Sequence, residues 1–151
     1  MQYTCEVVIK RPIEEVAALL DDRDNLAQWQ DTFRSWEPLC GEPGNPGAKT
    51  RLVYGTGDRR TVLVETILAR NGSHEFVATY ETEGLLQTVR SRLEALDEQR
   101  TRWRCSHELR FRGLTRLVGW WIGRGFSQQT LRTMNAFKVF AELKHRRDQR
   151  Q

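Results

Sequence analysis

The stretch VVIKRPIEEVAALLDDRDNLAQW, residues 7–29, predicts how this chain begins to fold. Apolar side chains alternate along residues 3–10, which is typical of a half-buried strand. Pro12 ends that strand and suits the first turn of a helix, and the residues after it carry apolar side chains at helical spacing. Asp21 and Asp22 can cap a second short helix over residues 22–33. The stretch therefore predicts one strand followed by two short helices.

The chain from about residue 33 to residue 112 predicts an antiparallel sheet. Turn signals separate six strand-like runs, and Asn71-Gly72 favours a type I′ hairpin between two of them. The last two runs alternate between apolar and charged side chains, so we expect one covered face and one wet face. The six runs are residues 34–41, 49–56, 59–70, 74–82, 86–96 and 101–112.

Residues 114–147 have helical character and contain no proline, which predicts one long helix. Glycines between residues 119 and 125 weaken its first part and predict a break or a kink there. The run LVGWWIGRGF, residues 117–126, is the most apolar in the chain, and Trp120 and Trp121 point in different directions on a helix. Two interpretations stay open: a mobile flap over one end of a cavity, in transient contact with a membrane surface, or a buried turn that completes the core.

The composition is typical of a globular protein and gives no sign of a cofactor or metal site. The chain has 151 residues, of which 38% are hydrophobic and 29% are charged. Its three Cys and three His are not spaced as metal ligands, so we expect no metal and no cofactor. The net charge of +4 is spread among acidic residues and does not predict nucleic-acid binding. Without a signal peptide pattern or a membrane-spanning run, we expect a cytoplasmic location with reduced thiols.

The order of these elements resembles the helix-grip fold of the START-like, or SRPBCC, superfamily. Residues 7–29 are similar to the superfamily's opening, and GNPGAKTRLVY, residues 44–54, is similar to its loop into the third strand. FKVFAE, residues 137–142, is similar to its closing Leu-Lys-x-x-x-Glu pattern, with Phe137 in the place of Leu. The resemblance implies one START-like domain over residues 1–151, with a basic tail at about 144–151. It implies an α+β fold in which a seven-stranded curved antiparallel sheet wraps around the long C-terminal helix, with two short helices after the first strand.

The resemblance also implies a cavity between the sheet and the long helix, where superfamily members bind lipids, sterols, quinones, polyketides or aromatic hormones. We therefore expect this chain to bind, or to transport, a small hydrophobic or aromatic molecule such as a lipid, quinone or polyketide. The run 59–70 is apolar on both faces, so the direction of Glu65 stays open. The expected ligand-binding residues are Trp29, Trp36, Tyr54, Phe76, Tyr80, Ser91, Trp103, His107, Trp121, Phe126, Thr130, Met134 and Phe137.

His107 is the one candidate that would turn this cavity into an active site. It lies on the covered face of its strand, where a buried imidazole needs a hydrogen-bond partner. As a general base, with Tyr80 or Ser91, it would serve a cyclase- or dehydratase-type enzyme. As a core residue, it would be satisfied by Ser91, Tyr80 or a water. No paired carboxylates and no nucleophile motif support the enzyme, so this hypothesis ranks below binding.

Two further alternatives concern the surface and the thiols. Arginines alternate with Glu94 and Glu108 on the outer face of the last two strands, which predicts a solvated face; a protein-interaction module that binds an acidic partner, or contact with an anionic membrane, is the alternative. The resemblance pairs the first and last strands, which would bring Cys5 near Cys105, and a disulfide then depends on the register. The sequence predicts no oligomeric state.

Overall fold

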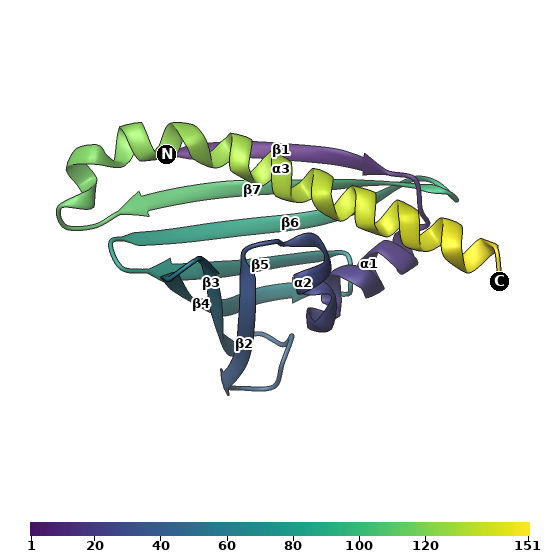
Figure 1. Cartoon of the computed structure of the whole chain (residues 1–151), viewed down its shortest axis with the longest axis horizontal. Helices are drawn as coiled ribbons and strands as arrows, with labels where there is room; N and C mark the ends of the chain where they lie inside the picture. The colour runs from purple at the N-terminus through teal and green to yellow at the C-terminus, as the bar shows by residue number, and fades with distance from the viewer.

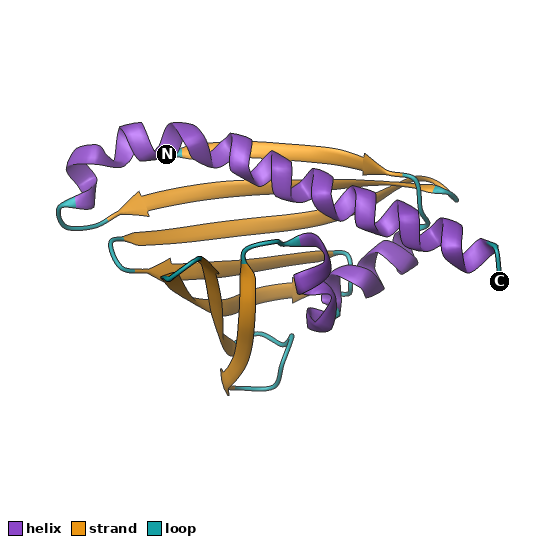
Figure 2. Ribbon diagram, in the orientation of Figure 1, coloured by secondary structure: helices purple, strands orange, loops and turns teal.

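A seven-stranded antiparallel sheet curves beside one long helix in the computed structural model, which describes residues 1–151 (Figures 1 and 2). This α+β arrangement confirms the predicted helix-grip fold. The strands are β1 (Gln2–Ile9), β2 (Phe33–Cys40), β3 (Lys49–Thr56), β4 (Arg59–Asn71), β5 (Glu75–Thr82), β6 (Leu85–Asp97) and β7 (Arg100–Phe111). The helices are α1 (Ile13–Asp21), the 3-10 turn η1 (Arg23–Asn25), α2 (Leu26–Trp29) and α3 (Thr115–Gln149).

The strand order explains how the two ends of the chain meet. It runs β1-β7-β6-β5-β4-β3-β2, so the strands from β2 to β7 pair with their neighbours in sequence, whereas β1 pairs with β7. Figure 1 shows the strands turning steadily from β1 to β2, as the twist of a sheet requires, until β2 is steeply inclined to β7. The sheet therefore curls into a trough, and α3 runs along the β1 and β7 side of it.

The first helices lie where the opening stretch predicts them, with one difference. The Asp22 carboxylate accepts a hydrogen bond from the backbone N–H of Asp24 at 3.0 Å, which confirms the predicted cap. The second helix is shorter than predicted, because the backbone becomes extended at Gln30 (φ −119°, ψ 99°) and the chain turns toward β2. This short η1–α2 segment lies between β2 and α1 in Figure 1, and α2 contacts both α3 and β2.

The burial of the β7 side chains confirms the alternation of covered and exposed residues predicted for this strand. Of the side chains predicted on the covered face, Trp103, Cys105, His107 and Leu109 are buried and Phe111 is half-buried, whereas Arg104 and Arg110 are exposed. The main core lies between this face, α1 and the second half of α3. Phe137 is fully buried there, with its ring 5.1 Å from that of Trp29 and 5.2 Å from that of Trp103. A second, small cluster lies under β4 and β5 and consists of Ala48, Ile67 and Ala78.

The first half of α3 approaches the end of the sheet through glycines. A Cβ atom at Gly119 would lie 2.7 Å from the Phe111 ring, and one at Gly123 would meet the Met1 sulfur. The helix is continuous from Thr115, but Figure 1 shows its first turns set at an angle to the rest, so the weak region is a kink and not a break. The buried-turn interpretation holds for the glycine face but is wrong for Trp120 and Trp121, which are exposed.

One predicted turn is wrong. A type I′ hairpin requires positive φ at both central residues, but only Gly72 has one (φ +61°), and no residue other than glycine does. Residues 72–74 instead form a three-residue connection between β4 and β5. Asn71 thus continues the strand, and the glycine alone takes the left-handed conformation.

None of the helices combines the length and apolarity that crossing a bilayer requires.

Candidate functional site

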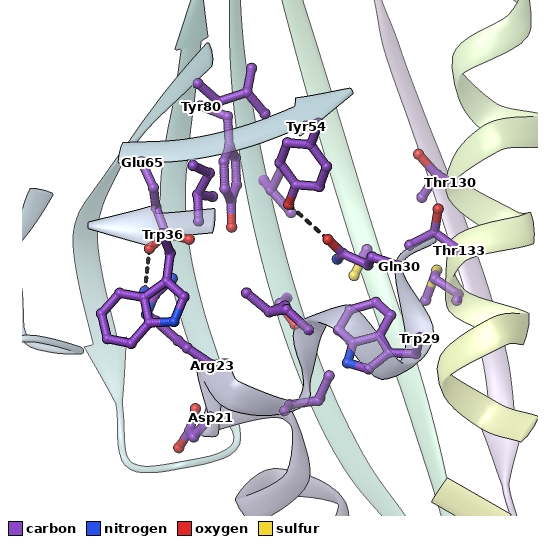
Figure 3. Close-up of a pocket in the computed structure, with 18 of the residues that line it drawn as sticks. Asp21, Arg23, Trp29, Gln30, Trp36, Tyr54, Glu65, Tyr80, Thr130 and Thr133 are labelled. Carbon is purple, nitrogen blue, oxygen red and sulfur yellow. Dashed lines mark hydrogen bonds and ion pairs between the residues drawn. The ribbon is translucent and has the colours of Figure 1, made fainter. Parts of the chain in front are cut away.

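A cavity of about 1460 Å³ lies between the inner face of the sheet, the η1–α2 segment and α3 (Figure 3). Strands β3 to β7 form its long wall, and α3 faces them with side chains from Phe126 to Val139. The two core clusters border this space without filling it, since residues of both lie in its wall. Ligand pockets commonly measure roughly 300–1,000 Å³, so this cavity has room for a molecule of several rings or a long chain.

The structure brings together eleven of the thirteen residues that the sequence analysis selected. Trp121 does not line the cavity, because the exposed first half of α3 carries it, with 68% of its surface accessible. Phe137 does not line it either, because it is enclosed in the main core. The residues in the cavity wall are Trp29, Trp36, Tyr54, Phe76, Tyr80, Ser91, Trp103, His107, Phe126, Thr130 and Met134.

An ion pair between Arg23 and Glu65 is a polar feature of the wall that sequence reasoning missed. Glu65 points inward from β4, with 7% of its side chain exposed, and Arg23 reaches it from η1 with 21% exposed (Figure 3). The Trp36 ring covers the guanidinium, whose carbon lies 5.9 Å from the ring centroid. The pair connects the η1–α2 segment to the middle of the sheet.

Two tyrosines stand beside this ion pair. The Tyr54 hydroxyl donates a hydrogen bond to Gln30 Oε1 at 2.8 Å (Figure 3). Burial, reinforced by the negative charge of Glu65, raises the pKa of Tyr54 to about 12, and the same two causes raise the pKa of Tyr80 well above its usual value. The Arg23 charge opposes both shifts. Both phenols therefore stay protonated at neutral pH and can donate hydrogen bonds.

A second set of polar side chains lies around His107 on β7. Its Nδ1 accepts a hydrogen bond from Gln87 Nε2 at 2.7 Å, and the Tyr3 ring stacks on the imidazole with centroids 4.6 Å apart. The Tyr3 hydroxyl in turn shares a hydrogen bond of 2.8 Å with Thr130 of α3. Burial lowers the pKa of His107 to about 4, so the ring is neutral at pH 7 and carries its proton on Nε2.

The partners of His107 differ from the predicted ones. Ser91 accepts a hydrogen bond from the Trp103 indole at 2.9 Å, and Tyr80 stands next to Glu65, so neither is bonded to the imidazole. The Nε2 of His107 is buried and has no hydrogen-bond partner in the protein, and the same is true of Trp29 Nε1. The wall thus holds two buried donors whose hydrogen bonds are not made by the protein.

An ion pair and a hydrogen bond connect distant segments of the chain at the rim of the cavity. Arg70 Nη2 contacts both carboxylate oxygens of Asp21 at 2.7 Å, and Arg70 Nη1 donates to the carbonyl oxygen of Gly44 at 3.1 Å. The end of α1, the β2–β3 loop and β4 therefore meet at one point of the cavity wall. This arrangement fixes the loop at the mouth of the cavity.

Cys5 and Cys105 do not form a disulfide and do not present reactive thiolates. The register of β1 and β7 places Cys5 directly opposite Cys105, and both thiols are free. Burial raises the pKa of Cys105 to about 12 and also raises that of Cys5. No group of three or more His, Cys, Asp or Glu side chains is arranged to hold a metal ion.

Comparison with known proteins finds likeness of structure and not of sequence. No protein-family model matches the chain, and no curated protein matches it. Among solved structures, the Zhui aromatase/cyclase from a Streptomyces species has a TM-score of 0.79 at 14% identity, over 94% of this chain and 93% of that one. A START superfamily protein from Mycobacterium smegmatis has a TM-score of 0.74 at 13% identity, over 94% and 97%.

The protein Ara h 8.0201 is similar to the same extent, with a TM-score of 0.74 at 15% identity over 93% of this chain and 97% of that one. These matches span almost the full length of both partners. They show that the chain has the START-like, helix-grip fold.

Proposed function

We propose that this chain of START-like fold binds a small hydrophobic or aromatic molecule in the cavity between its sheet and α3. The cavity of about 1460 Å³ carries the proposal, because a large concave space with a mainly apolar surface is the usual form of a small-molecule site. Apolar atoms, from side chains such as Leu52, Val89 and Met134, make up more of its surface than polar atoms do, as in most sites for small molecules. The likeness to a START superfamily protein and to an aromatase/cyclase supports the same function.

The polar groups of the wall favour a ligand that has oxygen atoms on an apolar frame. Tyr80 and the Arg23–Glu65 pair offer donors and an acceptor at one place, and the buried donors of Trp29 and His107 lack partners elsewhere. A buried donor without a partner costs about 1–3 kcal/mol, so a ligand carbonyl or hydroxyl oxygen that reaches one would add to affinity. A quinone, a polyketide or a lipid with a polar head has this make-up.

Binding or transport is favoured over catalysis by the surroundings of His107. An imidazole whose pKa is about 4 is a weak general base, and its contacts with Gln87 and Tyr3 hold it in the wall. Of its expected acid/base partners, Ser91 accepts a hydrogen bond from the Trp103 indole, and Tyr80 stands beside Glu65 rather than beside the imidazole. The surroundings of His107 therefore favour binding over the cyclase- or dehydratase-type alternative.

Mass spectrometry of an organic extract of the purified protein tests the proposal first. We expect a defined lipid, quinone or aromatic compound at a stoichiometric amount. A fluorescent apolar probe such as anilinonaphthalene sulfonate then tests the location. Leu63→Trp, on the cavity side of β4, should weaken probe binding by about tenfold, because the larger ring occupies part of the space in which the probe would lie.

Leu68→Trp is the matched control, since Leu68 lies on the same strand and is exposed. It should leave probe affinity within about twofold of the wild type. Equal affinities of the two variants, together with an extract that contains no bound compound, would contradict the proposal.

A further inference from the structure

The first half of α3 exposes a patch of large apolar side chains. Leu114 and Leu117 have 86% and 81% of their surface accessible, and Trp120 and Trp121 have 61% and 68%. Contiguous apolar exposure of this kind marks a surface that contacts something other than water. We name this surface the apolar patch, and it consists of Leu114, Leu117, Val118, Trp120, Trp121 and Ile122.

The patch cannot turn inward in this fold. The other side of the helix is occupied, since Gly119 and Gly123 are buried against Phe111 and Met1. None of the six patch residues lines the cavity. Exposure is therefore built into the way the helix packs, and the patch is separate from the proposed ligand site.

The segment that carries the patch holds positive charge only, while Glu83 lies in the neighbouring β5–β6 turn, whose Gly84 contacts Thr115. The chain contains no Asp or Glu from Leu109 to Ala141, but it contains several arginines there. Two of them, which precede the helix, are paired with Glu81 and Glu108. Arg116 and Arg124, on the helix, take part in no ion pair, and the Arg124 guanidinium lies 4.4 Å from the centroid of the Trp120 ring.

We propose that the apolar patch docks the protein on the surface of an anionic lipid bilayer. Tryptophan and leucine side chains would enter the headgroup region, where amphipathic rings are favoured, while Arg116 and Arg124 would contact lipid phosphates. A second copy of the chain fits this surface less well, because a two-fold contact through the patch would bring together Arg116 and Arg124 of both copies, which take part in no ion pair.

Sedimentation with lipid vesicles tests the proposal. The purified chain should bind vesicles of phosphatidylcholine and phosphatidylglycerol at least about tenfold more tightly than vesicles of phosphatidylcholine alone, and added salt should weaken the binding. Leu117→Ser/Trp121→Ser should lower affinity for the anionic vesicles by about tenfold or more, and so should Arg116→Gln/Arg124→Gln. The control is Leu143→Ser, an exposed leucine farther along the same helix, which should bind as the wild type does.

Failure of the wild type to bind anionic vesicles, or equal binding by the patch variants, would overturn the proposal. Light scattering supplies the other decisive result: a wild-type dimer that the Leu117→Ser/Trp121→Ser variant dissociates would assign the patch to a second copy instead. The proposal does not depend on a cavity ligand. Leu63→Trp should therefore bind vesicles normally even though its cavity is narrowed.

Discussion

Replacing Arg23 with methionine tests how strongly the ion pair in the cavity wall contributes to stability. The substitution leaves the Glu65 carboxylate with 7% of its side chain exposed and without its cation. Breaking a buried pair by removing one partner costs about 3–5 kcal/mol, because the remaining charge stays desolvated. We expect Arg23→Met to lower the free energy of unfolding by about 3 kcal/mol, the lower end of that range, since Arg23 itself is 21% exposed.

The reverse substitution should cost less. Glu65→Leu leaves Arg23 unpaired, but this longer side chain is three times as exposed as Glu65 and can turn its charge toward water. We expect a loss of about 1 kcal/mol. The double variant removes both charges and adds apolar surface. Its free energy of unfolding should therefore lie within about 1 kcal/mol of that of the wild type.

Urea unfolding followed by far-ultraviolet circular dichroism measures all four proteins of this cycle, and a constant slope m shows that stability alone has changed. A titration of tyrosine absorbance gives an independent check of the geometry. Because Glu65 raises and Arg23 lowers the pKa of Tyr54, Glu65→Leu should lower that pKa below about 12 and Arg23→Met should raise it. Equal losses from the two single variants, or a double variant as unstable as their sum, would refute the reasoning.

Three other measurements follow from the packing and the titrating groups. Because the folded pKa of His107 is about 4 and the unfolded value is about 6.5, the unfolded chain binds the extra proton; up to about 3 kcal/mol of stability should be lost as pH falls from 6.5 to 4, and His107→Gln should lose this slope in pH-dependent urea unfolding. Gly125→Ala should raise the free energy of unfolding by about 1 kcal/mol, because no atom lies within 4 Å of the added Cβ. Gly119→Ala should lower it, because its Cβ would meet the Phe111 ring. If thermal unfolding changes in the same direction for both variants, the α3 packing is contradicted. Phe137→Ala should cost about 3–5 kcal/mol and Trp121→Ala less than about 1 kcal/mol, and equal costs in urea unfolding would show that the patch is not exposed.

The fold was predictable because its signals are local. Pro12 ends β1 and starts α1, and the strict alternation in β7 fixes which of its side chains are covered. Each of these signals needs only the neighbours in sequence. The six strands after the short helices and the long α3 could therefore be located before any contact between them was known.

The polar part of the cavity was not predictable, because it depends on contacts between distant segments. Glu65 lies on a strand that is apolar on both faces, so periodicity did not show its direction, and its partner comes from a segment 42 residues away. His107 was placed correctly on the covered face, but its partner Gln87 is a polar residue that no pattern distinguishes. Trp121 was misplaced because an apolar run of α3 has two apolar faces, and only packing decides which one is covered.

The pairing of the first strand with the last has a consequence for how the protein is made. Gln2 lies opposite Glu108 and Ile9 opposite Thr101, so β1 leaves the ribosome about a hundred residues before its only neighbour in the sheet. The hairpins from β2 to β7 close over short loops and are expected to form first, since distant pairings are slower. α3 is synthesised after β7 and packs against β1. We therefore expect the cavity to be completed late in folding, when β1 pairs with β7 and α3 packs against both.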